Sequence, residues 1–194
     1  MPQVKDIMRS IAEHVFKTID ELDEKEVETM VAEIIKAKRV FVMGAGRSGL
    51  AAKAFAMRLS QMNLVVYVVG ETVTPGMGKD DLFVIVSGSG ETLSAVSAAK
   101  VAGDIGVRIV AITSYPGSSL GKLADNLVVV KGKTKADIEK DHLKHQIQGV
   151  HSSLTPLGTL FEDTVIVFLD GVVGRLMEVL GKQEFELKDR HANF

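Results

Sequence analysis

The stretch VFVMGAGRSGLAAKAFAMRL, residues 40–59, decides the fold of this chain. A short apolar run from Val40 to Met43 leads into the glycine-rich turn GAGRSG, Gly44 to Gly49, and then into a segment of helical character from Leu50 to Met62. A strand that passes through such a turn into a helix is the opening unit of a doubly wound α/β sheet. The free backbone N–H groups at the helix N-terminus bind anions. We therefore expect an anion site at this turn.

The same alternation of strand and helix continues through the sheet core, residues 38–130. Four further short apolar runs predict strands: Val65 to Val69, Leu82 to Val86, Ile109 to Ile112 and Leu127 to Val130. Two more segments predict helices: Glu91 to Ile105 and Ser119 to Ala124. This alternation favours a parallel sheet that is covered on both faces. The predicted fold class is α/β, a three-layer αβα arrangement around a five-stranded parallel sheet.

Helical segments flank this core. Residues 1–37 carry apolar side chains at a spacing of three or four residues, which predicts two N-terminal helices broken near Asp23. Residues 131–153 are polar without a clear period, as in a loop or a short helix that stands off the sheet. Residues 154–194 contain a long amphipathic helix from Pro156 to about Leu180 and then a tail. The length of 194 residues suits one domain.

The composition argues against several classes of partner. A net charge of -2, with both signs interspersed along the chain, gives no basic face for nucleic acid or for an anionic membrane. The absence of cysteine excludes disulfides, thiolate metal sites and a thiol nucleophile, and it fits a reducing cytoplasm. No apolar run approaches the roughly 18 residues that a membrane-spanning helix needs. We expect a cytoplasmic protein that binds neither nucleic acid nor membrane.

A second glycine-rich turn, SGSGET, follows the third predicted strand and opens the next helix. Both turns lie at the carboxyl ends of parallel strands, where ligands bind, so two helix N-termini point at one crevice. Four hydroxyl groups suffice to surround one phosphate monoester: those of Ser48, Ser87, Ser89 and Thr92. The candidate substrate-binding residues are Gly46, Arg47, Ser48, Ser87, Gly88, Ser89, Gly90, Glu91 and Thr92.

Two of these residues have an alternative interpretation. Arg47 can contact the substrate or form an ion pair at a subunit interface. Glu91 stands at the start of a helix, where a carboxylate stabilises the helix dipole. Glycine and serine are also common in strand-to-helix turns as turn formers and N-caps, without any ligand.

The first turn by itself also matches a dinucleotide-binding pattern. GAGRSG satisfies G-x-G-x-x-G, and Glu71 follows the second strand where a ribose-binding carboxylate can stand. A dinucleotide fold does not need the second turn, so we expect a terminal phosphate and no cofactor. His142, His145 and His151 lie close together in the polar segment, but the surrounding lysines favour a solvated face, and we expect no metal.

The two turns resemble those of the sugar isomerase (SIS) domain family of phosphosugar-binding proteins. Within it the chain is most similar to the 6-phospho-3-hexuloisomerases, over the stretches GAGRSGLAAKAFAMRLSQM, VGETVTPGMGKDDLFVIVSGSGET, PLGTLFEDTVIVFLD and RHANF. The resemblance implies a flavodoxin-like sheet and a homo-oligomer, commonly a tetramer. It also implies interconversion of D-arabino-hex-3-ulose 6-phosphate and fructose 6-phosphate, a step of the ribulose monophosphate route of formaldehyde fixation.

The resemblance further implies two catalytic residues. Moving a carbonyl between carbons 3 and 2 needs a base that removes a proton to give an enediolate, and the similarity places this base at Glu162 in PLGTLFE. From the residues alone, Glu162 can equally be a helix N-terminal carboxylate that stabilises the dipole. His191 in RHANF resembles a histidine that reaches a neighbouring subunit's site and assists ring opening, although a terminal histidine can also be frayed.

Other functions would use the same phosphate site. An arabinose 5-phosphate or sedoheptulose 7-phosphate isomerase of the same family would differ only in its sugar contacts. A sugar-phosphate sensor would bind without catalysis, but no helix-turn-helix region or basic patch for DNA is visible. A nicotinamide-dependent oxidoreductase would rely on GAGRSG and Glu71.

Overall fold

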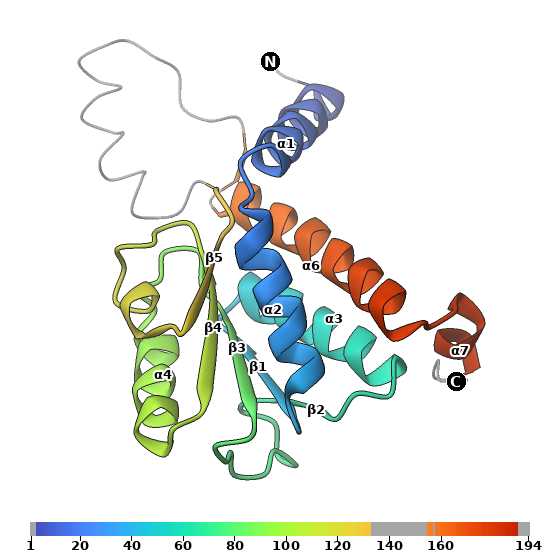
Figure 1. Cartoon of the computed structure of the whole chain (residues 1–194). Coiled ribbons are helices and arrows are strands. Elements are labelled where there is room, and N and C mark those ends of the chain that lie inside the picture. The colour runs from blue at the N-terminus through green and yellow to red at the C-terminus, as the bar shows by residue number, and fades with distance from the viewer. Residues whose placement is uncertain (1–2, 133–154, 157, 190–194) are drawn as a thin grey trace.

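The computed structural model describes residues 3–132, 155–156 and 158–189 of the chain (Figure 1). Its five strands are all parallel and lie in the order β2-β1-β3-β4-β5, the order of flavodoxin-like folds. The strands are β1 (Val40–Gly44), β2 (Val66–Val68), β3 (Leu82–Val86), β4 (Arg108–Thr113) and β5 (Asn126–Val129). The predicted fold class is confirmed.

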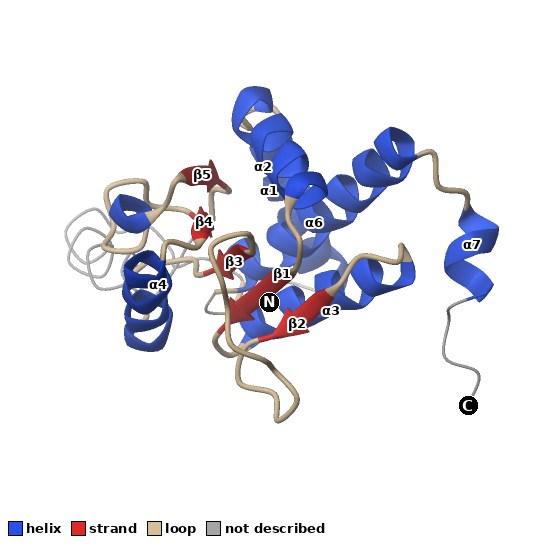
Figure 2. Ribbon diagram, turned by 60° about the horizontal axis from the view of Figure 1, so that its bottom comes forward, coloured by secondary structure: helices blue, strands red, loops and turns tan. Residues whose placement is uncertain are grey.

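Helices cover both faces of the sheet (Figure 2). The helices are α1 (Val4–Ile19), α2 (Glu24–Lys36), α3 (Arg47–Gln61), α4 (Leu93–Ile105), the 3-10 turn η1 (Gly121–Leu123), α6 (Thr159–Leu180) and α7 (Glu184–Asp189). On one face lie α2, α3 and α6, while α4 lies on the other with η1. The first helix, α1, packs on α6 and projects beyond the sheet (Figure 1).

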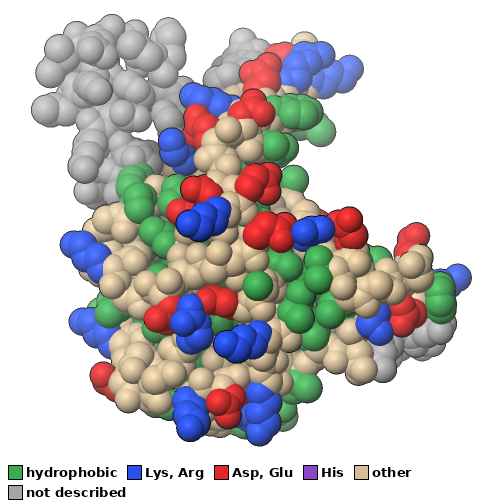
Figure 3. All heavy atoms as spheres, in the orientation of Figure 1, with side chains coloured by type: hydrophobic (Ala, Val, Ile, Leu, Met, Phe, Trp, Pro, Cys, Tyr) green, Lys and Arg blue, Asp and Glu red, His purple; other side chains and the backbone are tan. Residues whose placement is uncertain are grey.

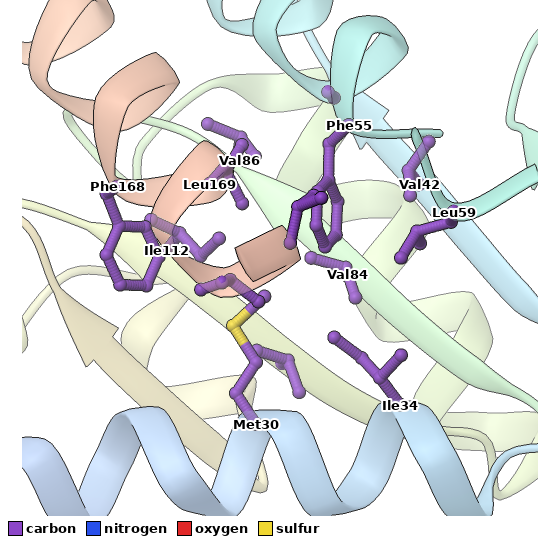
Figure 4. Packing of buried hydrophobic residues seen from close by; sticks show 14 of the residues in the cluster. Met30, Ile34, Val42, Phe55, Leu59, Val84, Val86, Ile112, Phe168 and Leu169 are labelled. Atoms are coloured by element: carbon purple, nitrogen blue, oxygen red, sulfur yellow. The ribbon is translucent and has the colours of Figure 1, made fainter. Parts of the chain in front are cut away.

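Alternation of side chains along the strands gives the sheet an apolar layer on each face. Val40 and Val42 point toward α2, α3 and α6, where they join a cluster with Met30, Phe55 and Phe168 (Figure 4). Phe41, between the two valines, points to the opposite face. There α4 presents small residues, which let it approach the sheet closely: Ala95, Ala99 and Ala102. Because both faces are buried, the strands are apolar at nearly every position.

Several elements begin or end away from their predicted positions. The helix expected from Leu50 begins three residues earlier, at Arg47, so the turn itself forms its first residues. The helix expected over Ser119 to Ala124 is only the 3-10 turn η1, since a segment this short does not sustain an α-helix. The helix expected from Pro156 begins at Thr159 because Gly158 has φ 81 and interrupts helical backbone. The short helix α7 was not predicted.

Charges of both signs are interspersed on the face of the molecule drawn in Figure 3. No broad area of Lys and Arg is seen on this face of the described residues. Among the described residues, no helix combines the length and the apolar character needed to cross a membrane.

An ion pair between Arg39 and Asp81 fixes the connection that enters β3. Arg39 donates from Nε to Asp81 Oδ1 at 2.9 Å and from Nη2 to Oδ2 at 2.6 Å, and the Gly78 N–H also donates to this carboxylate. The Asp81 side chain is only 1% exposed. Burial by itself would raise the pKa of Asp81, but the hydrogen bonds from Arg39 and Gly78 outweigh it and hold the pKa below its ordinary value.

We predict that Asp81→Asn lowers the free energy of unfolding by about 3 kcal/mol, because it leaves the Arg39 guanidinium without its charged partner. The exposed pair of Asp6 with Arg9 provides the control, and Asp6→Asn should cost less than about 1 kcal/mol. Urea unfolding measures both variants, and an Asp81→Asn protein as stable as the wild type would contradict the prediction.

The same pair predicts a pH dependence. Since the pKa of Asp81 is lowered in the folded state, its contribution to stability is present above the pKa of an unfolded aspartate, about 3.9. It is lost as the pH falls through the lowered pKa. The stability difference between wild type and Asp81→Asn should therefore shrink in acid.

Candidate functional site

A pocket of about 410 Å³ lies at the carboxyl ends of the strands, where the two glycine-rich turns meet the N-terminus of α6. Its described lining combines three parts of the chain that are distant in sequence: Ala45, Gly46, Arg47 and Ser48; Gly88, Ser89 and Thr92; and Gly158, Phe161 and Glu162. The pairing of β1 with β3 places Gly44 beside Val86, so the two turns follow neighbouring strand ends. The structure thus brings together most of the residues that the sequence singled out.

The first turn directs the N-terminus of α3 into the pocket. Gly46 is the N-cap and has φ 57 and ψ −133, a conformation open in practice only to glycine. Arg47 and Ser48 follow as the first two helical residues, whose N–H groups have no acceptor within the helix. Ser48 lines the pocket although the residue as a whole is buried. Backbone donors and a hydroxyl therefore converge on one place.

The second turn supplies two hydroxyls to the pocket and uses a third for support. Ser89 and Thr92 line the pocket, and Thr92 is the N-cap residue of α4. Ser87 is buried, and its Oγ lies 3.1 Å from Thr92 Oγ1. The described lining does not include Ser87, Gly90 or Glu91. Three of the four predicted hydroxyl residues line the pocket. The fourth, Ser87, orients the hydroxyl of Thr92.

The end of β4 and the chain that follows it support the second turn from outside. Gly88 O accepts hydrogen bonds from Ser114 N and Thr113 Oγ1, both at 3.1 Å. Glu91 Oε1 accepts from Ser119 N at 2.8 Å, and hydrogen bonding from Ser119 lowers the pKa of the Glu91 carboxyl. Glu91 is exposed and precedes the N-cap of α4, so its observed contact is with the supporting chain.

The candidate base, Glu162, lies in the first turn of α6 with its side chain 17% exposed. Arg47 reaches it from α3, with Nε 2.7 Å from Glu162 Oε2. The same guanidinium donates from Nη2 to Asp163 Oδ1 at 2.6 Å. Arg47 therefore bridges the first turn and the N-terminus of α6 within one chain.

Sequence reasoning did not single out Phe161 or Asp163. Phe161 is buried, and its ring lies against Gly88, where an added Cβ would be 2.8 Å from Phe161 Cδ1. This contact seats α6 on the second turn and so places the next residue, Glu162, in the pocket. The only sequence signal for either residue was its position next to Glu162.

Other candidates lie elsewhere in the structure or outside its described part. Glu71, the possible ribose ligand, forms an exposed ion pair with Lys53 at 2.6 Å. His191, together with His142, His145 and His151, lies outside the described residues. Within the described part of the chain, no three metal-binding side chains of His, Asp or Glu gather at one point.

The geometry of the pocket suits a small molecule that carries a phosphate and an acidic C–H bond. Two helix N-termini and the hydroxyls of Ser48, Ser89 and Thr92 can hold the phosphate oxygens. Glu162 lines the same pocket and is the one carboxylate in the described lining. The pocket thus combines donors of the kind that hold an anion with a carboxylate, the kind of group that serves as a general base.

We predict that Gly88→Ala lowers the free energy of unfolding by about 1 to 3 kcal/mol, since the new methyl group displaces the Phe161 ring from a packed position. Gly103→Ala in α4 is the control because nothing lies within 4 Å of its added Cβ, and it should stabilise by up to about 1 kcal/mol. Denaturant unfolding of the two variants compares them, and equal stabilities would rule out the proposed contact.

Comparison with known proteins identifies relatives over most of the chain. The SIS domain family matches residues 33–140. An uncharacterised protein of Aeropyrum pernix is 47% identical over 96% of this chain and 90% of its own. The 3-hexulose-6-phosphate isomerase of Bacillus subtilis is 37% identical over 89% of this chain and 88% of its own.

A solved structure from Methanococcus jannaschii, for which a function of 3-hexulose-6-phosphate isomerase was inferred, has a TM-score of 0.78 and 34% identity. The match covers 95% of this chain and 96% of that one. The family match spans both glycine-rich turns, and the relatives extend it to the helix that carries Glu162. The chain is therefore a member of the SIS domain family.

Proposed function

We propose that this protein is a phosphosugar isomerase that interconverts D-arabino-hex-3-ulose 6-phosphate and fructose 6-phosphate. The observation that carries the proposal is the presence of Glu162 in the same pocket as both phosphate-binding turns. Relatives named 3-hexulose-6-phosphate isomerase at 37% and 38% identity support the choice of substrate. Sugar phosphates are charged metabolites that do not leave the cell freely, so the proposed activity places the protein in the cytoplasm.

In the proposed reaction, the phosphate anchors the substrate and Glu162 moves a proton. Starting from the 3-ketose, the Glu162 carboxylate removes the proton from carbon 2, and the electrons form the carbon 2 to carbon 3 double bond of an enediolate. The carbon 2 hydroxyl then gives up its proton while the carbon 3 oxygen gains one, and the protonated Glu162 delivers a proton to carbon 3, which leaves the carbonyl at carbon 2. The helix N-termini and nearby donors stabilise the negative charge that develops, since they are already oriented before the reaction starts.

Ring opening concerns only the fructose side of the reaction. Fructose 6-phosphate closes to a furanose through its carbon 5 hydroxyl, whereas the 3-ketose has no hydroxyl placed to form a five- or six-membered ring. We propose that His191 assists this opening, and this role rests on the resemblance of RHANF to related isomerases.

We expect that the protein exchanges deuterium from heavy water into carbon 3 of fructose 6-phosphate, and that Glu162→Gln lowers this exchange by about a thousandfold while it still binds the sugar phosphate. The substitution keeps the shape of the side chain and removes the base. Nuclear magnetic resonance follows the exchange, and calorimetry measures the binding.

Glu13→Gln, at an exposed position on α1, provides the matched control and should exchange at the wild-type rate. Normal turnover by Glu162→Gln would show that another group is the base. A wild-type protein that binds fructose 6-phosphate without exchange would be a sensor. Exchange with arabinose 5-phosphate or sedoheptulose 7-phosphate alone would move the proposal to another isomerase of the family.

We also propose that the protein is a homo-oligomer, as the resemblance to tetrameric family members implies. The support from this chain is an apolar stripe on α1 that the described residues leave exposed: Val4, Met8, Phe16 and Ile19. Met8 is 63% exposed and Phe16 is 70% exposed. Such a stripe on a helix that projects from the sheet is suited to pack against a second copy (Figure 1).

We expect Met8→Glu to shift the protein toward smaller species, because a carboxylate cannot be buried unpaired in an apolar interface. Lys17→Glu places the same charge on the side of the helix opposite Met8 and should leave the size unchanged. Light scattering coupled to size-exclusion chromatography measures the mass of each. If Met8→Glu keeps the wild-type mass, α1 does not form the interface.

A further inference from the structure

We propose that Asp163 is a positioning residue, which holds Arg47 and so keeps Glu162 available as the base. The inference rests on the proposed isomerase function. It starts from the forked contact of one guanidinium with two consecutive carboxylates, Nε to Glu162 at 2.7 Å and Nη2 to Asp163 at 2.6 Å.

The fork requires an arginine because of the helix geometry. Consecutive residues of an α-helix point about 100° apart, so Glu162 and Asp163 face different directions from α6. A guanidinium carries its N–H donors on three separate nitrogens in a rigid planar arrangement, so Nε and Nη2 reach acceptors that point apart, whereas lysine carries all its donors on one nitrogen. Arg47 is therefore shared between the pocket wall and the carboxylate beside it.

The two carboxylates differ in their exposure and in their position relative to the pocket. Glu162 lines the pocket and is 17% exposed, while Asp163 is 34% exposed and is not part of the described lining. Only Glu162 is placed to touch a substrate. Asp163 touches Arg47 and is not placed to exchange a proton with the substrate.

During the proposed proton transfer, Glu162 loses its negative charge as it takes up the proton. Arg47 attracts the charged form of Glu162, and this attraction is weakened when Glu162 becomes neutral. The contact with Arg47 therefore raises the free-energy barrier to proton abstraction. Asp163 reduces this effect because it shares the guanidinium and keeps it paired after Glu162 becomes neutral. If Asp163 lost its charge, Arg47 would pair more closely with Glu162 and proton abstraction would slow.

This division of roles predicts a change in turnover with little change in binding. In the proposed complex the substrate phosphate is held by backbone N–H groups and hydroxyls of the two turns, whereas Asp163 contacts the first turn through the Arg47 side chain. Asp163→Asn should therefore lower kcat about tenfold and change KM less than about twofold. Asp163→Glu, which keeps the charge, should restore kcat to within about threefold of the wild type.

The decisive comparison repeats the substitution in a protein that lacks the fork. If Asp163 acts through Arg47, then adding Asp163→Asn to Arg47→Gln should change kcat less than about twofold, because the contact is already gone. Asp170→Asn is the matched control, an exposed aspartate on the same helix, and should leave kcat and KM unchanged. Thermal unfolding checks that each variant is folded.

Three results would overturn the inference: a kcat for Asp163→Asn within twofold of the wild type, a loss of activity that lies mainly in KM, or an equal fall of kcat in the Arg47→Gln background. The last result would assign Asp163 a role in helix structure that is independent of Arg47. A wild-type protein without isomerase activity would refute the proposed function instead, so the two failures are distinguishable.

Discussion

The parallel pairing of β1 with β3 is the constraint on which the site depends. These strands are distant in sequence but adjacent in the sheet, with Gly44 beside Val86 at their carboxyl ends. Each strand then turns directly into a helix, so the N-termini of α3 and α4 open on one pocket. Helix N-termini attract anions, and two of them with hydroxyls between them form a local anion site on a chain whose net charge is -2.

The third part of the site comes from α6, and its placement depends on the second turn. Phe161 packs against Gly88, and only a residue without a side chain leaves room for that ring. The contact fixes the start of α6 and carries Glu162 to the pocket wall. Arg47 then joins α6 to the first turn through its two carboxylate contacts. The two glycine-rich turns and the proposed base are therefore held in one connected arrangement.

Much of the fold and of the candidate site was predictable from the sequence, because local residue patterns specify the strands, the helices and the turns between them. The alternation of strands and helices predicted the parallel sheet, and glycines and hydroxyls after two strands predicted where the pocket lies. The role of Ser87 was not predictable, since its burial and its contact with Thr92 depend on how the turn folds. Asp163 was not predicted because consecutive helix residues, here Glu162 and Asp163, point in different directions. Only the contact of Arg47 with both carboxylates connects Asp163 to the pocket. The start of α6 at Thr159 was not predicted, because the apolar spacing from Pro156 onward does not show that Gly158 adopts a non-helical backbone conformation.

The central claim is that one pocket holds the phosphate and presents Glu162 to the sugar. A crystal structure with fructose 6-phosphate bound tests it most directly. The account predicts phosphate oxygens on the hydroxyls of Ser48, Ser89 and Thr92, and a Glu162 carboxylate oxygen within about 3.5 Å of carbon 3. A phosphate bound away from the two turns, or a sugar whose carbon 3 lies beyond the reach of Glu162, would contradict it.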